Sequence, residues 1–258
     1  KNHIAEDEYD QLREFLRSNK ISALFIRHSP ILNNSIFWPK SALELNRITY
    51  ITKLYKYKSF SERLLDLKQK VRWSVNHSIK KGYKVKLYKR PDKKLIKDFY
   101  DIYLLRMKSK ETNPFYFFNY EIIESHFFNL EEKCDLVSAF DSKGNLVAGA
   151  LILLDKFDTV HYHLSACNQI AMKDQVIEHL LVKSFDEYAN LGYKFFRLGG
   201  GSDVFEKDGL SRFKKKFSDT TDSFFISKII CDEELYESYR REVSIKHPNI
   251  FLNSDAKI

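Results

Sequence analysis

The chain has 258 residues, of which 43% are hydrophobic, 30% charged and 15% aromatic. A chain of this length and composition can bury a substantial core, which excludes an intrinsically disordered protein and predicts one large domain or two small fused domains. The longest apolar run, Leu146–Leu154, is much shorter than the roughly 20 residues that a transmembrane helix requires, so no such helix is expected.

The cysteines and the first residues predict the compartment. The three cysteines, Cys134, Cys167 and Cys231, lie far apart and have no CxxC spacing. This pattern argues against a disulfide framework and a structural zinc site, and no metal is expected. The first residues, Lys1–Glu8, show no basic segment followed by an apolar one, as a secretion signal would. A reducing cytoplasm is therefore the expected location.

The net charge of +8 is unevenly distributed. From Lys53 to Lys97 there are 16 basic and 3 acidic residues, a local net charge of +13, which leaves −5 for the remainder. Such a segment is either an ordinary solvated surface or a field that attracts a polyanion. A nucleic acid, a phosphorylated substrate and an anionic membrane all remain open as partners.

The first quarter of the chain predicts part of an α/β lobe, with a helix at 6–18 and strands at 21–27 and 47–54. A long basic helix is expected at 59–81, because Ser59 and Glu62 have capping-box spacing and apolar residues recur at helical intervals before Gly82. The expected segments are a partial N-terminal lobe at 1–58, a bridging helix at 59–82, a main domain at 83–245 and a tail at 246–258.

The remaining elements alternate in a characteristic order. The sequence predicts a strand at 83–89, helices at 92–108 and 119–132, and three antiparallel strands at 135–140, 146–154 and 159–166. A helix at 171–191, a strand at 194–198, a helix at 210–217 and a strand at 223–231 follow. This order predicts an α/β fold with a mixed, largely antiparallel sheet flanked by helices.

Four local motifs accompany this order: His161-Tyr-His-Leu-Ser-Ala166, Tyr188-Ala-Asn-Leu-Gly-Tyr193, Phe196-Arg-Leu-Gly-Gly-Gly201 and Asp208-Gly-Leu-Ser-Arg-Phe-Lys-Lys-Lys-Phe217. Together they resemble the FemAB-like branch of the GNAT acyltransferase superfamily, over roughly 49–239. The resemblance implies a GNAT-like sheet preceded by a partial second GNAT-like lobe. It also implies transfer of an acyl or aminoacyl group to an amine of a peptidoglycan precursor or surface sugar.

Lys214 is the strongest candidate catalytic residue. Phe213 and Phe217 share a helix face at (i, i+4), and Lys214 projects beside that face as a fixed cation. By resemblance, Lys214 would neutralise a donor phosphate or the developing oxyanion, with Arg212 as a neighbour that either assists or lies on the surface. The consecutive glycines Gly199, Gly200 and Gly201 either let a ligand approach the main chain or form a plain strand exit.

Other candidates have weaker signals. His161 and His163 share a strand face; either is a candidate general base, although packed strand histidines are more common. Asp203 and Glu206 follow the glycines and are candidates to accept the amine proton or to hold a sugar hydroxyl. The tyrosine acid of many GNAT enzymes has no candidate in 210–217, so the source of the leaving-group proton is unassigned.

The acceptor side is predicted from charge. Arg72, Lys80 and Lys81 suit phosphate contacts, and a surface-only role for them is equally consistent with the sequence. The resemblance implies a nucleotide- or lipid-diphosphate-linked acceptor. The aromatic run 115–118 either lines an acceptor cleft or, as the favoured interpretation, forms core.

The leading hypothesis is a cytoplasmic N-acyltransferase that uses acyl-CoA, with the inner face of the membrane as one possible position. The segment 168–176 lacks the Gln/Arg-x-x-Gly-x-Gly/Ala loop that ordinarily binds the pyrophosphate of coenzyme A at a helix N-terminus. That departure, with the basic segment, supports aminoacyl-tRNA as the alternative donor, although no long helical arm is present. A non-catalytic polyanion-binding module is the third hypothesis. The oligomeric state is not predicted.

Overall fold

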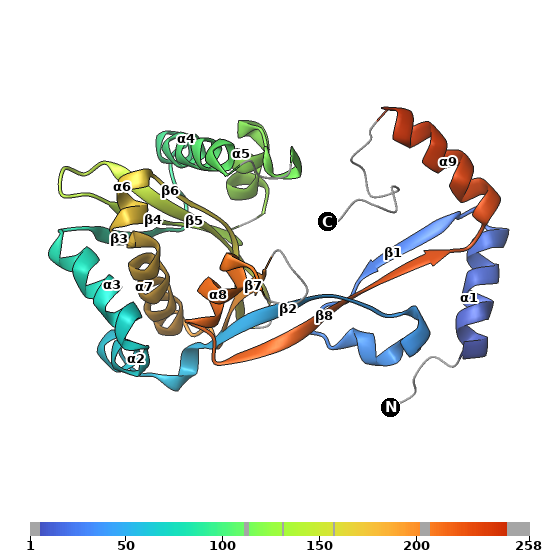
Figure 1. Cartoon of the computed structure of the whole chain (residues 1–258), viewed down its shortest axis with the longest axis horizontal. Coiled ribbons are helices and arrows are strands. Elements are labelled where there is room, and N and C mark those ends of the chain that lie inside the picture. The colour runs from blue at the N-terminus through green and yellow to red at the C-terminus, as the bar shows by residue number, and fades with distance from the viewer. Residues whose placement is uncertain (1–5, 111–113, 131, 157, 202–206, 247–258) are drawn as a thin grey trace. The chain divides into compact units, whose positions relative to one another are not determined.

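The computed structural model describes residues 6–110, 114–130, 132–156, 158–201 and 207–246. They cluster into two compact units (Figure 1). The larger unit is Thr49–Thr221, and the smaller unit is built from the described parts of Lys1–Ile48 and Asp222–Ile258. The smaller unit therefore takes residues from both ends of the chain, which the sequence placed in separate segments.

The described strands form an eight-stranded sheet in the order β1-β8-β2-β7-β6-β5-β4-β3. Neighbouring strands from β7 to β3 are antiparallel except for β6 and β7, which are parallel. The predicted mixed, largely antiparallel sheet is confirmed. The strand bounds are β1 (Ala23–Arg27), β2 (Glu44–Lys53), β3 (Lys84–Tyr88), β4 (Cys134–Phe140), β5 (Leu146–Leu154), β6 (Thr159–Cys167), β7 (Phe195–Gly200) and β8 (Thr220–Ile230).

Short polar side chains cap the first turn of several helices. Asp92 accepts a hydrogen bond from the backbone of Leu95, and Asn119 from that of Ile122, so both predicted helix starts are confirmed. The α-helices are α1 (Glu6–Ser18), α2 (Phe60–Asp66), α3 (Gln69–Lys80), α4 (Lys93–Ser109), α5 (Tyr120–Asn129), α6 (Gln169–Lys173), α7 (Val176–Asn190), α8 (Gly209–Lys215) and α9 (Glu233–Lys246). Short 3₁₀ turns are η1 (Asn34–Phe37), η2 (Lys40–Ala42), η3 (Leu54–Lys56) and η4 (Pro114–Tyr116).

Two predicted helices are each broken into two. The helix predicted at 59–81 is interrupted because Leu67 and Lys68 adopt extended backbone, with ψ of 149° and 143°, which lets Leu67 pack against the core. The helix predicted at 171–191 is interrupted at Gln175, whose φ of 56° is left-handed. The helix α9 was not predicted.

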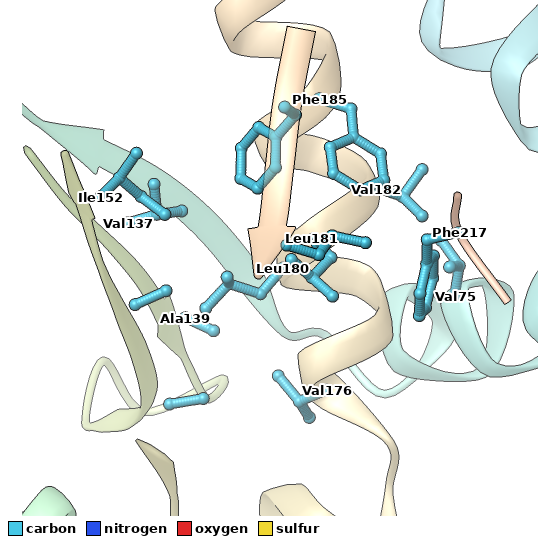
Figure 2. Packing of buried hydrophobic residues seen from close by; sticks show 14 of the residues in the cluster. Val75, Val137, Ala139, Ile152, Val176, Leu180, Leu181, Val182, Phe185 and Phe217 are labelled. Atoms are coloured by element: carbon cyan, nitrogen blue, oxygen red, sulfur yellow. The ribbon is translucent and has the colours of Figure 1, made fainter. Parts of the chain in front are cut away.

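The larger unit is layered, with a helix layer on each face of its sheet (Figure 1). One core cluster joins β4 and β5 to α7, and Figure 2 shows the α7 side chains Leu180, Leu181 and Phe185 in this cluster with Val137 and Ile152. Full burial of each leucine contributes about 1.5–3 kcal/mol. A second cluster joins the opposite face to α4 and α5. The buried faces hold the strands of the site in place from both sides.

The smaller unit has its own packing. In it β1 pairs antiparallel with β8, from Ala23 opposite Ile230 to Arg27 opposite Ile226. The buried His28 ring bonds the Ser227 hydroxyl at 2.7 Å, and its centroid lies 5.5 Å from the Trp38 ring.

Candidate active site

The two parallel strands β6 and β7 separate soon after they meet. Their described ladder holds three pairs, from Thr159 opposite Phe195 to His161 opposite Arg197. Beyond His161, β6 continues to Cys167 bonded to β5 on its other side. Among the described residues, the edge of β6 that faces β7 is therefore not paired with β7 after His161. Main-chain groups in that position are suited to hydrogen-bonding an acyl donor.

A β-bulge marks the point of separation. Leu151 pairs with Leu164 and Ile152 pairs with Tyr162, so His163 is an extra residue on β6. A bulge changes the direction of its side chain and bends the strand. His163, a predicted base candidate, thus stands at a bulge that no pattern in the sequence indicated.

The His163 ring lies 5.4 Å from the His126 ring of α5, measured between centroids. Although His163 is exposed, desolvation of its ring, and then the charges of His126 and His161, lower its pKa to about 4. His163 is therefore uncharged at neutral pH and a weak base. The neighbouring His161 has a different partner, the Asp155 carboxylate, at 2.9 Å.

Lys214 lies in α8 beside the glycine run. Its side chain is only 7% exposed, and Nζ donates a hydrogen bond to the Gly200 carbonyl oxygen at 2.6 Å. The rings of Phe213 and Phe217 lie 5.3 Å apart, as their spacing predicts, and Phe217 is buried. A buried ammonium group needs hydrogen-bond acceptors to offset its desolvation, which fixes its position.

The glycine run allows α8 to approach β7 closely. A Cβ atom at Gly201 would lie 1.8 Å from Ser211 Oγ and 2.4 Å from Asp208 Oδ2. Asp208 caps α8 by accepting from the backbone of Ser211 at 3.0 Å, and the Ser211 hydroxyl donates to the same carboxylate at 2.5 Å. Gly199 has a φ of +72°, which a side chain would strain. Sequence reasoning missed the Asp208–Ser211 pair, although Asp208 stands in a capping position.

The start of α7 carries two carboxylates. Asp174 accepts hydrogen bonds from the Tyr83 hydroxyl at 2.7 Å and from Lys81 Nζ at 3.0 Å. Glu178, in the first turn, is 8% exposed, and burial raises its pKa. The Lys216 ammonium lies 3.8 Å from the Glu178 carboxylate. A diphosphate at this helix end would meet a buried carboxylate, so the end is not arranged as an anion site.

The predicted phosphate-binding residues have local partners. Arg72 Nη1 donates to the Leu65 carbonyl at 2.6 Å, and Lys81 pairs with Asp174 as above, while Lys80 is exposed on α3. Arg212 Nη1 donates to the Lys207 carbonyl at 3.1 Å. The described contacts of Arg72 and Lys81 are thus with α2 and the start of α7, not with α8. Asp203 and Glu206 lie outside the described residues.

The favoured core interpretation of the aromatic run is wrong for three of its residues. Phe115, Tyr116 and Phe117 are 65%, 37% and 40% exposed. They lie on the surface because η4 is a short turn anchored by the Tyr103 hydroxyl, which donates to the Tyr116 carbonyl at 2.6 Å. Phe118 packs against the second core cluster.

In the part of the chain that the structure describes, no three His, Cys, Asp or Glu side chains gather in a way that would hold a metal ion. Among the described helices, none combines the length and apolar character needed to cross a membrane.

Comparison with solved structures identifies the fold. The chain superposes on FemX with a TM-score of 0.65 at 14% identity, over 90% of this chain and 78% of the other. It also matches the C-terminal domain of a putative lysylphosphatidylglycerol synthetase from Agrobacterium fabrum, with a TM-score of 0.58 at 13% identity over 93% and 79% of the chains. For L-PGS from Bacillus licheniformis the TM-score is 0.55 at 14% identity, over 83% and 64%.

No protein-family model and no curated protein sequence matches the chain. The structural matches show an acyltransferase-type fold of the mixed α/β class. The fold that the motifs around Gly199–Gly201 and Lys214 predicted is thus confirmed as that of FemX and of the lysylphosphatidylglycerol synthetase domain.

Proposed function

We propose that this protein transfers an acyl group from an activated donor to an amine at the opening between β6 and β7. The observation that carries the proposal is the position of Lys214, a buried cation held at the Gly200 carbonyl beside two strands that separate. Acyl transfer requires stabilisation of a tetrahedral oxyanion, and a preorganised ammonium with main-chain N–H groups supplies it.

The amine nitrogen attacks the acyl carbonyl carbon, a C–N bond forms, and the carbonyl oxygen becomes an oxyanion near Lys214. The bond from carbon to the leaving oxygen or sulfur then breaks. The amine loses one proton and the leaving group gains one, and neutral His163 is the candidate acceptor of the amine proton.

The start of α7 favours an aminoacyl ester over acyl-CoA as donor. Glu178 is buried where coenzyme A pyrophosphate would be expected, and Asp174 stands just before the helix. The chain lacks the pyrophosphate loop but carries the basic segment Lys53–Lys97, which suits a nucleic-acid-linked donor. The name lysylphosphatidylglycerol synthetase, carried by a structural neighbour, also denotes formation of an aminoacyl product. We therefore propose aminoacyl-tRNA as donor and an amine of a cell-envelope sugar or peptidoglycan precursor as acceptor.

A donor comparison tests this proposal. Aminoacylated and deacylated bulk tRNA, and acetyl-CoA, are titrated separately into wild-type, Lys214→Ala and Lys215→Ala protein at two salt concentrations. We expect tighter binding of aminoacylated than of deacylated tRNA, weakened by Lys214→Ala and unchanged by Lys215→Ala, whose side chain is exposed. Saturable binding of acetyl-CoA, with no preference for aminoacylated over deacylated tRNA, would show that the donor is an acyl-CoA. Binding of neither donor would refute the transferase proposal.

A further inference from the structure

The outer face of α3 carries an exposed tryptophan. Val71, Ser74, Val75 and Ser78 are at most 2% exposed, and the Ser78 hydroxyl lies 3.0 Å from His179 of α7. Figure 1 shows α3 on the outer side of α7. Helical periodicity places Trp73 on the opposite side of α3 from these buried residues, and it is 58% exposed. Burial in the fold therefore does not account for this large apolar side chain.

The surroundings of Trp73 are apolar and basic. Leu65, at the end of α2, is 69% exposed, and its carbonyl accepts from Arg72, the neighbour of Trp73. The Trp73 ring stacks on His77 with centroids 4.8 Å apart and an interplanar angle of 11°, which holds the indole in one orientation. We define the Trp73 face as Leu65, Lys68, Lys70, Arg72, Trp73 and Lys80.

Two nearby acids have cationic partners. Asp66 is bonded to Lys56 and to the Tyr57 hydroxyl. Asp174 pairs with Lys81 at 3.0 Å and lies 3.5 Å from His77 Nε2. A third acid, Glu62 on α2, accepts from the Lys58 backbone N–H. The Trp73 face itself carries four cations, two large exposed apolar side chains and no acid.

We propose that the Trp73 face binds the surface of an anionic membrane. Tryptophan is favoured at the level of lipid headgroups, where its ring is partly apolar and its N–H remains near water. Leu65 adds an aliphatic side chain that a lipid interface can bury, whereas a nucleic acid offers no comparable partner for it. The surrounding lysines and Arg72 match phosphate headgroups. The inference goes beyond acyl transfer. It shares the basic segment Lys53–Lys97 with the donor proposal, but it rests on the exposed Trp73 and Leu65, which that proposal does not use.

A single-tryptophan protein gives the direct test. The chain has two tryptophans, so Trp38→Phe leaves Trp73 as the only one. The variant is titrated with vesicles of phosphatidylcholine alone and of phosphatidylcholine mixed with phosphatidylglycerol. We expect a blue shift and reduced acrylamide quenching with the anionic vesicles, both reversed by high salt. No change with anionic vesicles, or an equal change with neutral ones, would overturn the proposal.

Vesicle sedimentation then assigns the residues. Each cation near an anionic surface contributes about 1 kcal/mol, or roughly a fivefold factor in partitioning, so Lys68→Ala with Lys80→Ala should weaken binding by about 25-fold. Trp73→Ala should weaken it by about tenfold. Leu105→Ala, an equally exposed apolar position on α4 at 68%, is the control and should change it less than twofold.

The nucleic-acid alternative is tested in the same format. If bulk tRNA changes the Trp73 emission and anionic vesicles do not, the face binds nucleic acid and the membrane proposal is wrong. The vesicle measurements require no acyl donor. An absence of vesicle binding would therefore leave the transferase proposal unaffected, and an absence of donor binding would leave the membrane proposal unaffected.

Discussion

Lys214 Nζ donates a hydrogen bond to the main-chain carbonyl of Gly200 at 2.6 Å. Gly200 is the last residue of β7 and lies three residues beyond Arg197, where the β6–β7 ladder ends. The ammonium group is therefore fixed by the strand that forms one side of the opening. This relationship ties the glycine motif to the lysine motif and gives Lys214 a defined position for charge stabilisation.

Replacement of Lys214 tests that role. Lys214→Ala should lower kcat by about 100- to 1000-fold, the range seen when a preorganised oxyanion donor is removed, because the tetrahedral oxygen loses its cation. KM for the donor should also rise, in line with the weaker donor binding expected of this variant, but by a smaller factor than kcat falls. Steady-state kinetics with the donor selected by the binding comparison measure both.

Lys215→Ala is the matched control, since Lys215 is the exposed next residue of the same helix. Its kinetics should be within twofold of wild type. An equal loss of kcat in both variants would show that the helix as a whole, not the Lys214 ammonium, is required.

Much of the larger unit follows from local sequence. The alternating apolar residues of the strands, and the caps Asp92 and Asn119, predict their elements because hydrophobic periodicity and N-cap chemistry act within a few residues. The Gly-Gly-Gly and Phe-Lys-x-x-Phe motifs also identified the segments that meet around Lys214. These strands, caps and motifs are each specified by residues only a few positions apart in the chain.

Other features depend on long-range packing. The extra residue His163 arises from the register of β6 against β5, which no pattern within β6 specifies. The left-handed Gln175 breaks a segment of otherwise continuous helical periodicity. Glu178 looks like an ordinary first-turn acid in the sequence, and its burial appears only when β6, α7 and Lys216 are brought together.

Gly201→Ala should destabilise the protein. The new Cβ would overlap Ser211 Oγ and Asp208 Oδ2 at 1.8 and 2.4 Å, so the capped start of α8 must shift. We expect a loss of about 1–3 kcal/mol in the free energy of unfolding, the usual cost of overpacking. Urea denaturation measures this value.

Gly209→Ala is the control within the same helix. Its Cβ would have as its nearest neighbour Arg212 Nη2 at 4.0 Å, which is ordinary contact, and alanine favours helix. This variant should be as stable as wild type or slightly more stable. Equal destabilisation by both substitutions would contradict the close-approach explanation of the glycine run.

Asp135→Asn should remove a pH dependence of stability. Asp135 is 1% exposed and accepts from the Tyr188 hydroxyl at 2.9 Å; burial raises its pKa to about 6. Between the ordinary carboxyl pKa and about 6 the folded state binds more protons than the unfolded state, so this group lowers stability as pH rises through that window. The shift corresponds to roughly 3 kcal/mol at neutral pH.

The measurement is the difference in unfolding free energy between wild type and Asp135→Asn at pH 4.5 and pH 7. Taking the difference cancels the opposite contributions of carboxylates whose pKa is lowered, such as Asp141 and Asp174. We expect the variant to gain stability relative to wild type at the higher pH. A difference that does not change with pH would show that Asp135 is ionised in the folded protein throughout.

His163 should set the acid limb of the transfer rate. A neutral imidazole accepts the amine proton and a protonated one does not. Once the rate is corrected for protonation of the acceptor amine, kcat should therefore fall only as the pH approaches about 4, the lowered pKa of His163. His126→Ala removes a neighbouring charge and part of the desolvation, so the limb should move upward toward the ordinary histidine range. His163→Gln should lower kcat by about 100-fold or more and abolish the limb.

Trp38 and Trp73 fluorescence, recorded over the same pH range, separates loss of activity from unfolding. This control is needed because the buried His179 also has its pKa lowered to about 4. An acid limb that stays in place in both histidine variants would assign the proton transfer to another group.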